Sequence, residues 1–293
     1  MHHPFPLART ARALLAYRTR SLPGNRLPAA RRIVERLRAG LASGCAPGWI
    51  RRREQVINSP VQLVLTNDDG IDAPGLAALE AAADSAGELV VVAPAGAQSG
   101  VGHQITTHAP IQVDALAPRR LRVAGTPADC ARIALTTIAP HAAWLLSGIN
   151  RGGNLGADVY TSGTVAAARE AALLGYRAIA LSQYVARERA LDWELTVRRV
   201  AAVLALLLAR PLEPGHFWNV NLPHPPGDET VLPIVFCGLD TRPHGVRYRR
   251  DGDRYTYVGD YHERPRHPGR DVDVCMGGRI AVTKVTLEIA AAE

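Results

Sequence analysis

Short apolar runs alternate with longer segments of helical periodicity between residues 61 and 222. The runs are rich in Val, Leu and Ile, as is typical of strands buried on both faces of a parallel sheet. The predicted strands span residues 61–66, 88–93, 111–113, 121–124, 144–147 and 178–182. The predicted helices span residues 75–86, 126–138, 164–174 and 191–208. This alternation indicates βαβ units and a doubly wound, mostly parallel α/β sheet of the Rossmann-like kind.

The pattern is different at both ends of the chain. Strand-like stretches at 231–236, 254–258 and 279–289 follow a region dense in Pro, Gly, Arg and His. We therefore predict three parts, namely a flexible basic N-terminal extension (1–58), an α/β catalytic core (59–222) and a β-rich C-terminal extension of hairpins (223–293). Because long exposed strands associate unless they are paired, we expect these hairpins to bind another copy of the chain.

The positive charge is concentrated near the N-terminus. Residues 1–53 contain twelve arginines and one acid, so their net charge is +11. Because the net charge of the whole chain is +7, the remaining residues carry −4. Because the rest of the chain is acidic, its charge argues against a nucleic-acid partner for the body of the chain. No apolar run reaches the ~18 residues that a membrane span requires. The four cysteines are scattered without paired spacing, which is typical of a reduced, cytoplasmic protein.

Two adjacent carboxylates, Asp68 and Asp69, directly follow the first predicted strand. In open α/β sheets, ligands bind at the carboxyl ends of the strands. Two acids side by side at this point repel each other unless a cation lies between them. Divalent metal ions bind carboxylate oxygens readily, so the sequence predicts a metal site here.

Two further polar loops, at residues 97–103 and 147–158, also follow predicted strands. The three loops share one edge of a doubly wound sheet, so we expect their side chains to converge. Together they offer carboxylates, a hydroxyl and amides, and such oxygen donors suit Mg²⁺ or Mn²⁺. His103, in the second loop, is a candidate for protonating a leaving-group oxygen or for binding phosphate.

Ser162, Gly163 and Thr164 stand at the start of a predicted helix. The unpaired N–H groups of a helix start attract phosphate, and glycine lets the backbone approach it closely. The alternative is a simple serine N-cap. Beside a metal site we favour phosphate binding, which indicates hydrolysis of a phosphoryl ester by metal-activated water. Asp68 or Asp69 is then a candidate base or nucleophile, and the sequence favours neither.

These motifs together resemble the SurE family, the stationary-phase survival nucleotidases. The resemblance is strong over residues 61–183 and continues through W-N-V-N-L-P at 218–223. The sequences that carry it are L-T-N-D-D-G-I-D-A-P-G-L, A-P-A-G-A-Q-S-G-V-G-H-Q-I-T, G-T-P-A-D-C and S-G-I-N-R-G-G-N-L-G-A-D-V-Y-T-S-G-T-V-A-A-A-R-E-A.

The resemblance implies a phosphatase that requires one divalent ion, Mg²⁺ or Mn²⁺, and acts on nucleoside 5′- and 3′-monophosphates. The implied metal ligands are Asp68, Asp69, Ser99 and Asn150, and the implied phosphate site is lined by Asn154 and by Ser162, Gly163 and Thr164. The resemblance also implies a homodimer or homotetramer that exchanges C-terminal hairpins. Two alternatives remain, a phosphatase for polyphosphate and a metal-stabilised interaction protein with a basic N-terminal arm.

Overall fold

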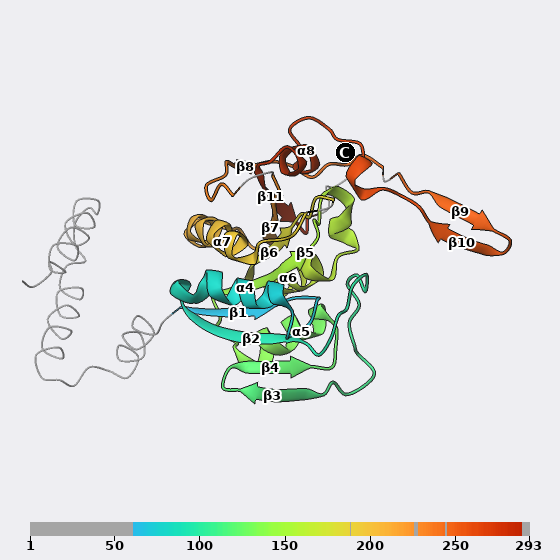
Figure 1. Cartoon of the computed structure of the whole chain (residues 1–293). Coiled ribbons are helices and arrows are strands. Elements are labelled where there is room, and N and C mark those ends of the chain that lie inside the picture. Colours follow the sequence, from blue (N-terminus) through green and yellow to red (C-terminus); the bar gives the residue numbers. More distant parts are fainter. Residues whose placement is uncertain (1–60, 188, 226–227, 244, 289–293) are drawn as a thin grey trace, which may run out of the picture. The chain divides into compact units, whose positions relative to one another are not determined.

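A nine-stranded sheet runs through the part of the chain that the structure, a computed structural model, describes. The described residues are 61–187, 189–225, 228–243 and 245–288, so the predicted extension at 1–58 lies outside them. The strand order is β3-β4-β2-β1-β5-β6-β7-β11-β8 (Figure 1). The strands are β1 (Gln62–Thr66), β2 (Glu88–Pro94), β3 (Val113–Ala117), β4 (Arg120–Val123), β5 (Trp144–Arg151), β6 (Arg177–Gln183), β7 (His216–Leu222), β8 (Ile234–Phe236) and β11 (Ile280–Thr286).

The central part of this sheet is parallel. All neighbouring pairs from β4 to β7 are parallel, whereas β3 is antiparallel to β4 and β11 is antiparallel to β7. The chain passes outward from β1 to β2 and β4 on one side, and from β5 to β6 and β7 on the other. The order therefore reverses between β1 and β5, which confirms the doubly wound fold and marks the edge where such sheets bind ligands.

Helices cover both faces of the sheet. The helices are α4 (Pro74–Ala83), α5 (Pro127–Ile133), α6 (Gly163–Leu173) and α7 (Trp193–Leu208). Within β1, Leu63 and Leu65 pack into the core with α4 and α7, whereas Val64 packs into the core with α5 and α6. Because successive side chains of a strand point to opposite faces, a strand with a helix layer on each side must be apolar throughout.

The start of α5 is fixed by its own sequence. The Thr126 side chain accepts from the Asp129 N–H, and the Asp129 carboxylate accepts from the Thr126 N–H, so the two form a capping box with Pro127 in the first turn. The helix was expected to reach residue 138. It ends instead at Ile133, and a π-helical turn, Ala134–Ile138, follows it.

The C-terminal part differs from the expectation in three respects. β8 and β11 join the main sheet, so the sheet is not divided at residue 222. Among the described residues, only β9 (Tyr248–Asp251) and β10 (Arg254–Tyr257) form a separate antiparallel hairpin, hereafter the arm. A helix, α8 (Asp271–Met276), precedes β11. β11 belongs to the core because Ile280, Ala281 and Val282 are almost completely buried.

Two further differences from the prediction concern single strands of the sheet, β3 and β7. The strand expected at 111–113 is β3, which begins at Val113 and has exposed residues at its C-terminal end. β7 was not predicted, because Asn219 and Asn221 interrupt its apolar pattern although both are buried. No helix in the described ranges is long and apolar enough to cross a membrane.

Candidate active site

A tight turn ends β1 and holds two carboxylates at the strand end. The Asn67 side chain donates to the Gly70 carbonyl (2.8 Å) and accepts from the Gly70 N–H (3.2 Å). Gly70 has a φ of +104°, and a Cβ at this position would lie 3.1 Å from the backbone carbon of Gly96. The turn therefore requires glycine, and it keeps Asp68 and Asp69 directly beyond the last strand residue.

The Asp68 carboxylate lies against the N-terminus of α6. Thr164 donates its hydroxyl to Asp68 Oδ1 at 2.5 Å, and its backbone N–H also bonds to the carboxylate. The helix approaches closely because residue 163 is glycine. Burial nevertheless raises the pKa of Asp68, and the neighbouring Asp69 raises it further. The start of α6, predicted as a phosphate site, is therefore already bonded to a buried acid.

Asp69 lies beside the third loop. The Arg151 N–H donates to Asp69 Oδ2 at 3.4 Å, and burial raises the pKa of this carboxyl group as well. Asn150, the preceding residue, donates its side-chain amide to the Gly152 carbonyl (2.9 Å). Its Oδ1 atom has no hydrogen-bond donor among the described residues, so this oxygen is available to a ligand.

The second loop is joined to the first through the backbone. The Gln98 N–H donates to the Asp68 carbonyl at 2.7 Å, which brings Ser99, an exposed residue, next to the first loop. The far end of the second loop is anchored on α5, because Thr126 donates its hydroxyl to the Gln104 carbonyl at 2.7 Å. The first loop is thus bonded directly to both of the other loops that were predicted to converge with it.

The chemistry of these residues fits a divalent cation. No ion pair within the described residues involves Asp68 or Asp69, although both are at least partly buried and adjacent. Together with Ser99 and Asn150, the two acids offer only oxygen atoms as metal ligands. The described residues contain no cluster of three or more His, Cys, Asp or Glu side chains suited to a metal. The site is therefore one of mixed carboxylate, hydroxyl and amide oxygens, which suits Mg²⁺ or Mn²⁺.

The predicted phosphate-site residues are partly engaged inside the protein. Ser162 Oγ accepts from the Val165 N–H at 3.1 Å and caps α6. Asn154 is turned toward the sheet, where its amide donates to Ser182 Oγ (2.8 Å) and its N–H donates to Asn221 Oδ1 (2.8 Å). No hydrogen bond of the described residues joins Asn154 to Asp68 or to the start of α6.

His103 is held from both sides of its ring. Nε2 lies 2.7 Å from Glu170 Oε2, and Nδ1 lies 3.3 Å from Arg169 Nη1. Glu170 is 2% exposed and also accepts from Arg132 Nε at 2.6 Å. Burial alone would raise the pKa of Glu170, but the bonds from His103 and Arg132 outweigh it and lower that pKa.

Sequence reasoning did not single out Glu170. The available signal was a lone acid in an alanine-rich helix whose other residues are mostly buried. A buried carboxylate of this kind requires charged or hydrogen-bonding partners. In the folded chain these partners are Arg132 and His103.

The site thus combines one buried and one partly buried acid with a helix start at the switch point of an open α/β sheet. Doubly wound α/β proteins bind their ligands at this position. The chain matches the family model "Survival protein SurE" over residues 63–243, and it belongs to that family. The match includes all three loops and the start of α6.

Individual relatives agree with this assignment. A protein of Nostoc sp. is 53% identical over 223 residues, which cover 76% of this chain and 98% of that protein. The 5′-nucleotidase SurE of Roseobacter denitrificans is 39% identical over 254 residues, covering 79% of this chain and 95% of the relative. The crystal structure of the SurE protein from Aquifex aeolicus matches with a TM-score of 0.70 at 30% identity, covering 78% of this chain and 94% of that chain.

Proposed function

We propose that this chain is a divalent-metal-dependent phosphatase that hydrolyses nucleoside 5′- and 3′-monophosphates. The observation that carries the proposal is the adjacent pair of Asp68, which is buried against the start of α6, and Asp69, which is partly buried. Neither acid forms an ion pair within the described residues. The relative from Roseobacter denitrificans is named as a 5′-nucleotidase, which supports the nucleotide as substrate.

Asp68, Asp69, Ser99 and Asn150 would hold the metal ion, Mg²⁺ or Mn²⁺. When bound, such an ion polarises a phosphoryl oxygen and acidifies a water molecule. The protein has to supply a fixed arrangement of oxygen atoms and exclude competing cationic side chains. The hydrogen bonds from Thr164 to Asp68 and from the Arg151 N–H to Asp69 provide this fixed arrangement.

The start of α6 would bind the phosphate. The positive end of the helix dipole favours an anion. The space at Gly163 is taken by Asp68, so the phosphate would bind at the helix start beside this carboxylate. The Ser162 cap fixes the first turn, so we assign it a supporting part in this site. Of the two acids Asp69 is the more exposed, and we assign to it the proton released by the attacking water.

His103 and Asn154 would act mainly by holding the loops. A phosphate contact from His103 would require its ring to leave Glu170 or Arg169. We therefore propose that His103 fixes the second loop and that Asn154 fixes the third loop on β6 and β7. Both would then influence the phosphate site through the backbone.

We further propose that the protein acts in the cytoplasm as a homodimer or homotetramer. Cys130, Cys237 and Cys275 are free, which agrees with a reducing compartment. All residues of β9 and β10 are exposed, and the arm pairs only with itself in the described structure. Exposed strands of this kind are suited to pairing with a second copy of the chain.

Phosphate release from a substrate panel tests the proposed function. The panel contains nucleoside 5′- and 3′-monophosphates, p-nitrophenyl phosphate and polyphosphate, measured with EDTA and after addition of Mg²⁺ or Mn²⁺. We expect hydrolysis that needs the metal and favours nucleotides. A clear preference for polyphosphate would overturn the substrate class. Absence of hydrolysis in protein that binds Mn²⁺ would instead favour an interaction protein.

A further inference from the structure

The part of the third loop beyond Asn150, with its continuation to the start of α6 (residues 151–162), connects two parts of the site. It begins after Asn150, a proposed metal ligand, and ends at Ser162, the cap of α6. The segment is therefore joined to a proposed metal ligand at one end and to the start of α6 at the other, so that a displacement of the segment would act on both. Asn154 anchors it to the sheet, as described above. Its other side is held by the segment that follows the arm.

Tyr261 and Arg264 make these contacts. The Tyr261 hydroxyl lies 3.0 Å from the Gly153 carbonyl and 3.1 Å from Asp158 Oδ2. Arg264 Nη1 donates to the same Asp158 Oδ2 at 2.6 Å. Arg264 Nη2 donates to the Leu155 carbonyl at 3.3 Å, and its guanidinium lies over the Tyr261 ring at 4.9 Å from the centroid. Two neighbouring side chains thus bind three residues of the loop.

This contact is largely shielded from water. The side chains of Arg264 and Asp158 are 11% and 16% exposed. Burial raises the pKa of Tyr261, so its hydroxyl keeps the proton that it donates to the loop. A charge-assisted bond in such a setting is stronger and more sensitive to geometry than a surface ion pair.

A buried acid reinforces the same side of the loop. Asp271, at the start of α8, is completely buried and accepts from the backbone N–H groups of Gly156 (2.7 Å), Asp240 (2.7 Å) and Val272 (2.9 Å). Asp240 precedes the arm and Asp271 follows it. The two chain segments at the base of the arm are therefore joined to each other and to the third loop.

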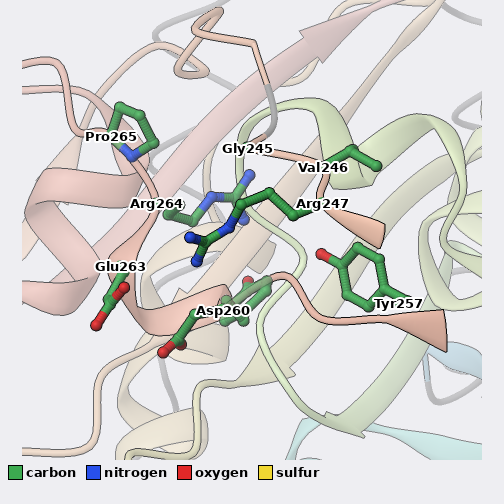
Figure 2. A pocket seen from close by; sticks show the side chains of 9 residues that line it. Gly245, Val246, Arg247, Tyr257, Asp260, Glu263, Arg264 and Pro265 are labelled. Atoms are coloured by element: carbon green, nitrogen blue, oxygen red, sulfur yellow. The ribbon is translucent and has the colours of Figure 1, made fainter. Parts of the chain in front are cut away.

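The arm itself has few other attachments. Within the described residues its strands pair with each other, and Tyr248 and Tyr257 stack edge to face across them. Figure 2 shows the pocket at its base, which is lined by Tyr257 of the arm and by both Arg247 and Arg264. Arg264 thus lies between the arm and the third loop.

We propose that Tyr261 and Arg264 are positioning residues that couple the base of the arm to the third loop and thereby set the geometry of the metal and phosphate site. The part that concerns catalysis rests on the proposed function. A displacement of the arm would act on the site through the Gly153, Leu155 and Asp158 contacts. Any partner of the arm, including a second copy of the chain, would then influence the rate of hydrolysis.

The test compares two pairs of variants in the full-length chain. Tyr261→Phe removes only the hydroxyl, and Arg264→Met removes the charge while keeping most of the apolar stem. Tyr257→Phe and Arg247→Met are the matched controls, because they change the same residue types at exposed positions on the other side of the pocket. Arg264→Lys adds a variant that keeps the positive charge near Asp158.

Two readouts are needed. Hydrogen exchange of the backbone amides of residues 151–162 reports on the loop directly, without requiring activity. We expect faster exchange there in Tyr261→Phe and Arg264→Met than in wild type and the controls. We also expect kcat to fall by about tenfold to a hundredfold, because small displacements of reacting groups have effects of this size. Arg264→Lys should recover part of the loss.

Exchange and kcat equal to those of the controls would overturn the inference. A fall in thermal stability without faster exchange in 151–162 would also overturn it, since the residues would then act only on general stability. If wild type hydrolyses no substrate, the proposed function and with it the catalytic part of the coupling fail, whereas hydrogen exchange still decides whether Tyr261 and Arg264 hold the loop.

Discussion

Gly163 lies so close to Asp68 that a Cβ at residue 163 would be 2.9 Å from Asp68 Cβ and 3.0 Å from Asp68 Oδ2. The start of α6 can therefore reach the carboxylate only because residue 163 has no side chain. We predict that Gly163→Ala displaces Asp68 and lowers kcat at least about tenfold. The measurement is steady-state hydrolysis of a nucleoside 5′-monophosphate at saturating Mn²⁺.

Gly96→Ala is the control for this change. Gly96 lies directly before the second loop, and a Cβ there would meet no atom within 4 Å. We expect it to retain wild-type kcat. Thermal melting of both variants separates displacement of the carboxylate from unfolding. A fully active Gly163→Ala variant would show that this close approach has no part in the reaction.

Asp69→Asn should abolish hydrolysis with little effect on folding. The change removes the charge of one proposed metal ligand in a partly exposed polar loop, and an asparagine oxygen can still accept from the Arg151 N–H. We expect the melting temperature to stay within a few degrees of wild type, since surface substitutions typically change stability by about 0.5 kcal/mol or less. Unchanged turnover in a folded variant would remove Asp69 from the metal site.

Ser99→Ala should have a smaller effect. Ser99 is exposed and contributes a neutral oxygen, which a water molecule can replace. We predict that the Mn²⁺ concentration for half-maximal activity rises by a factor of a few, on the order of 1 kcal/mol, while kcat at saturating metal changes little. A metal titration that superposes on the wild-type curve would exclude Ser99 as a ligand.

Glu170 should make stability depend on pH. Its pKa is lowered in the folded protein, so its contribution to stability is present above the unfolded-state pKa of about 4.3 and is lost as the pH falls through the folded-state value. Glu170→Gln should therefore be less stable than wild type at neutral pH. The difference should shrink as the pH falls below about 4.

Urea denaturation at a series of pH values measures this dependence. The midpoint of wild type should fall more steeply toward acidic pH than that of the variant. Parallel curves for the two proteins would mean that Glu170 contributes the same free energy in both protonation states.

Much of the fold could be predicted because β1 and its neighbours are apolar throughout and are separated by helical segments. The capping box of Thr126 and Asp129 likewise reveals the start of α5 from four residues of sequence. β7 was missed for a physical reason. Asn219 and Asn221 are buried only because both donate their amides to the Asn154 carbonyl, a partner 65 or more residues away. A local pattern contains no information on such a partner.

The residues of the candidate site also fall into those that the sequence indicated and those that it did not. Asp68 and Asp69 became candidates because they directly follow a predicted strand, and the topology of the sheet brings their loop next to the second one. Ser99 was assigned as a ligand through the family resemblance. Glu170, Tyr261 and Arg264 were missed because their partners become neighbours only in the folded chain. Arg264, for example, lies 106 residues from Asp158 along the chain and appears in the sequence as one of many arginines.

The most direct test of the metal-dependent site is the rate of phosphate release as a function of Mn²⁺ concentration, for EDTA-treated wild type and for Asp68→Asn. The asparagine can still accept from Thr164, so the variant keeps the bond that holds this residue on α6. We predict a saturable increase from near zero in wild type and no increase in the variant. Full activity of wild type in EDTA, or the same curve for both proteins, would contradict the account.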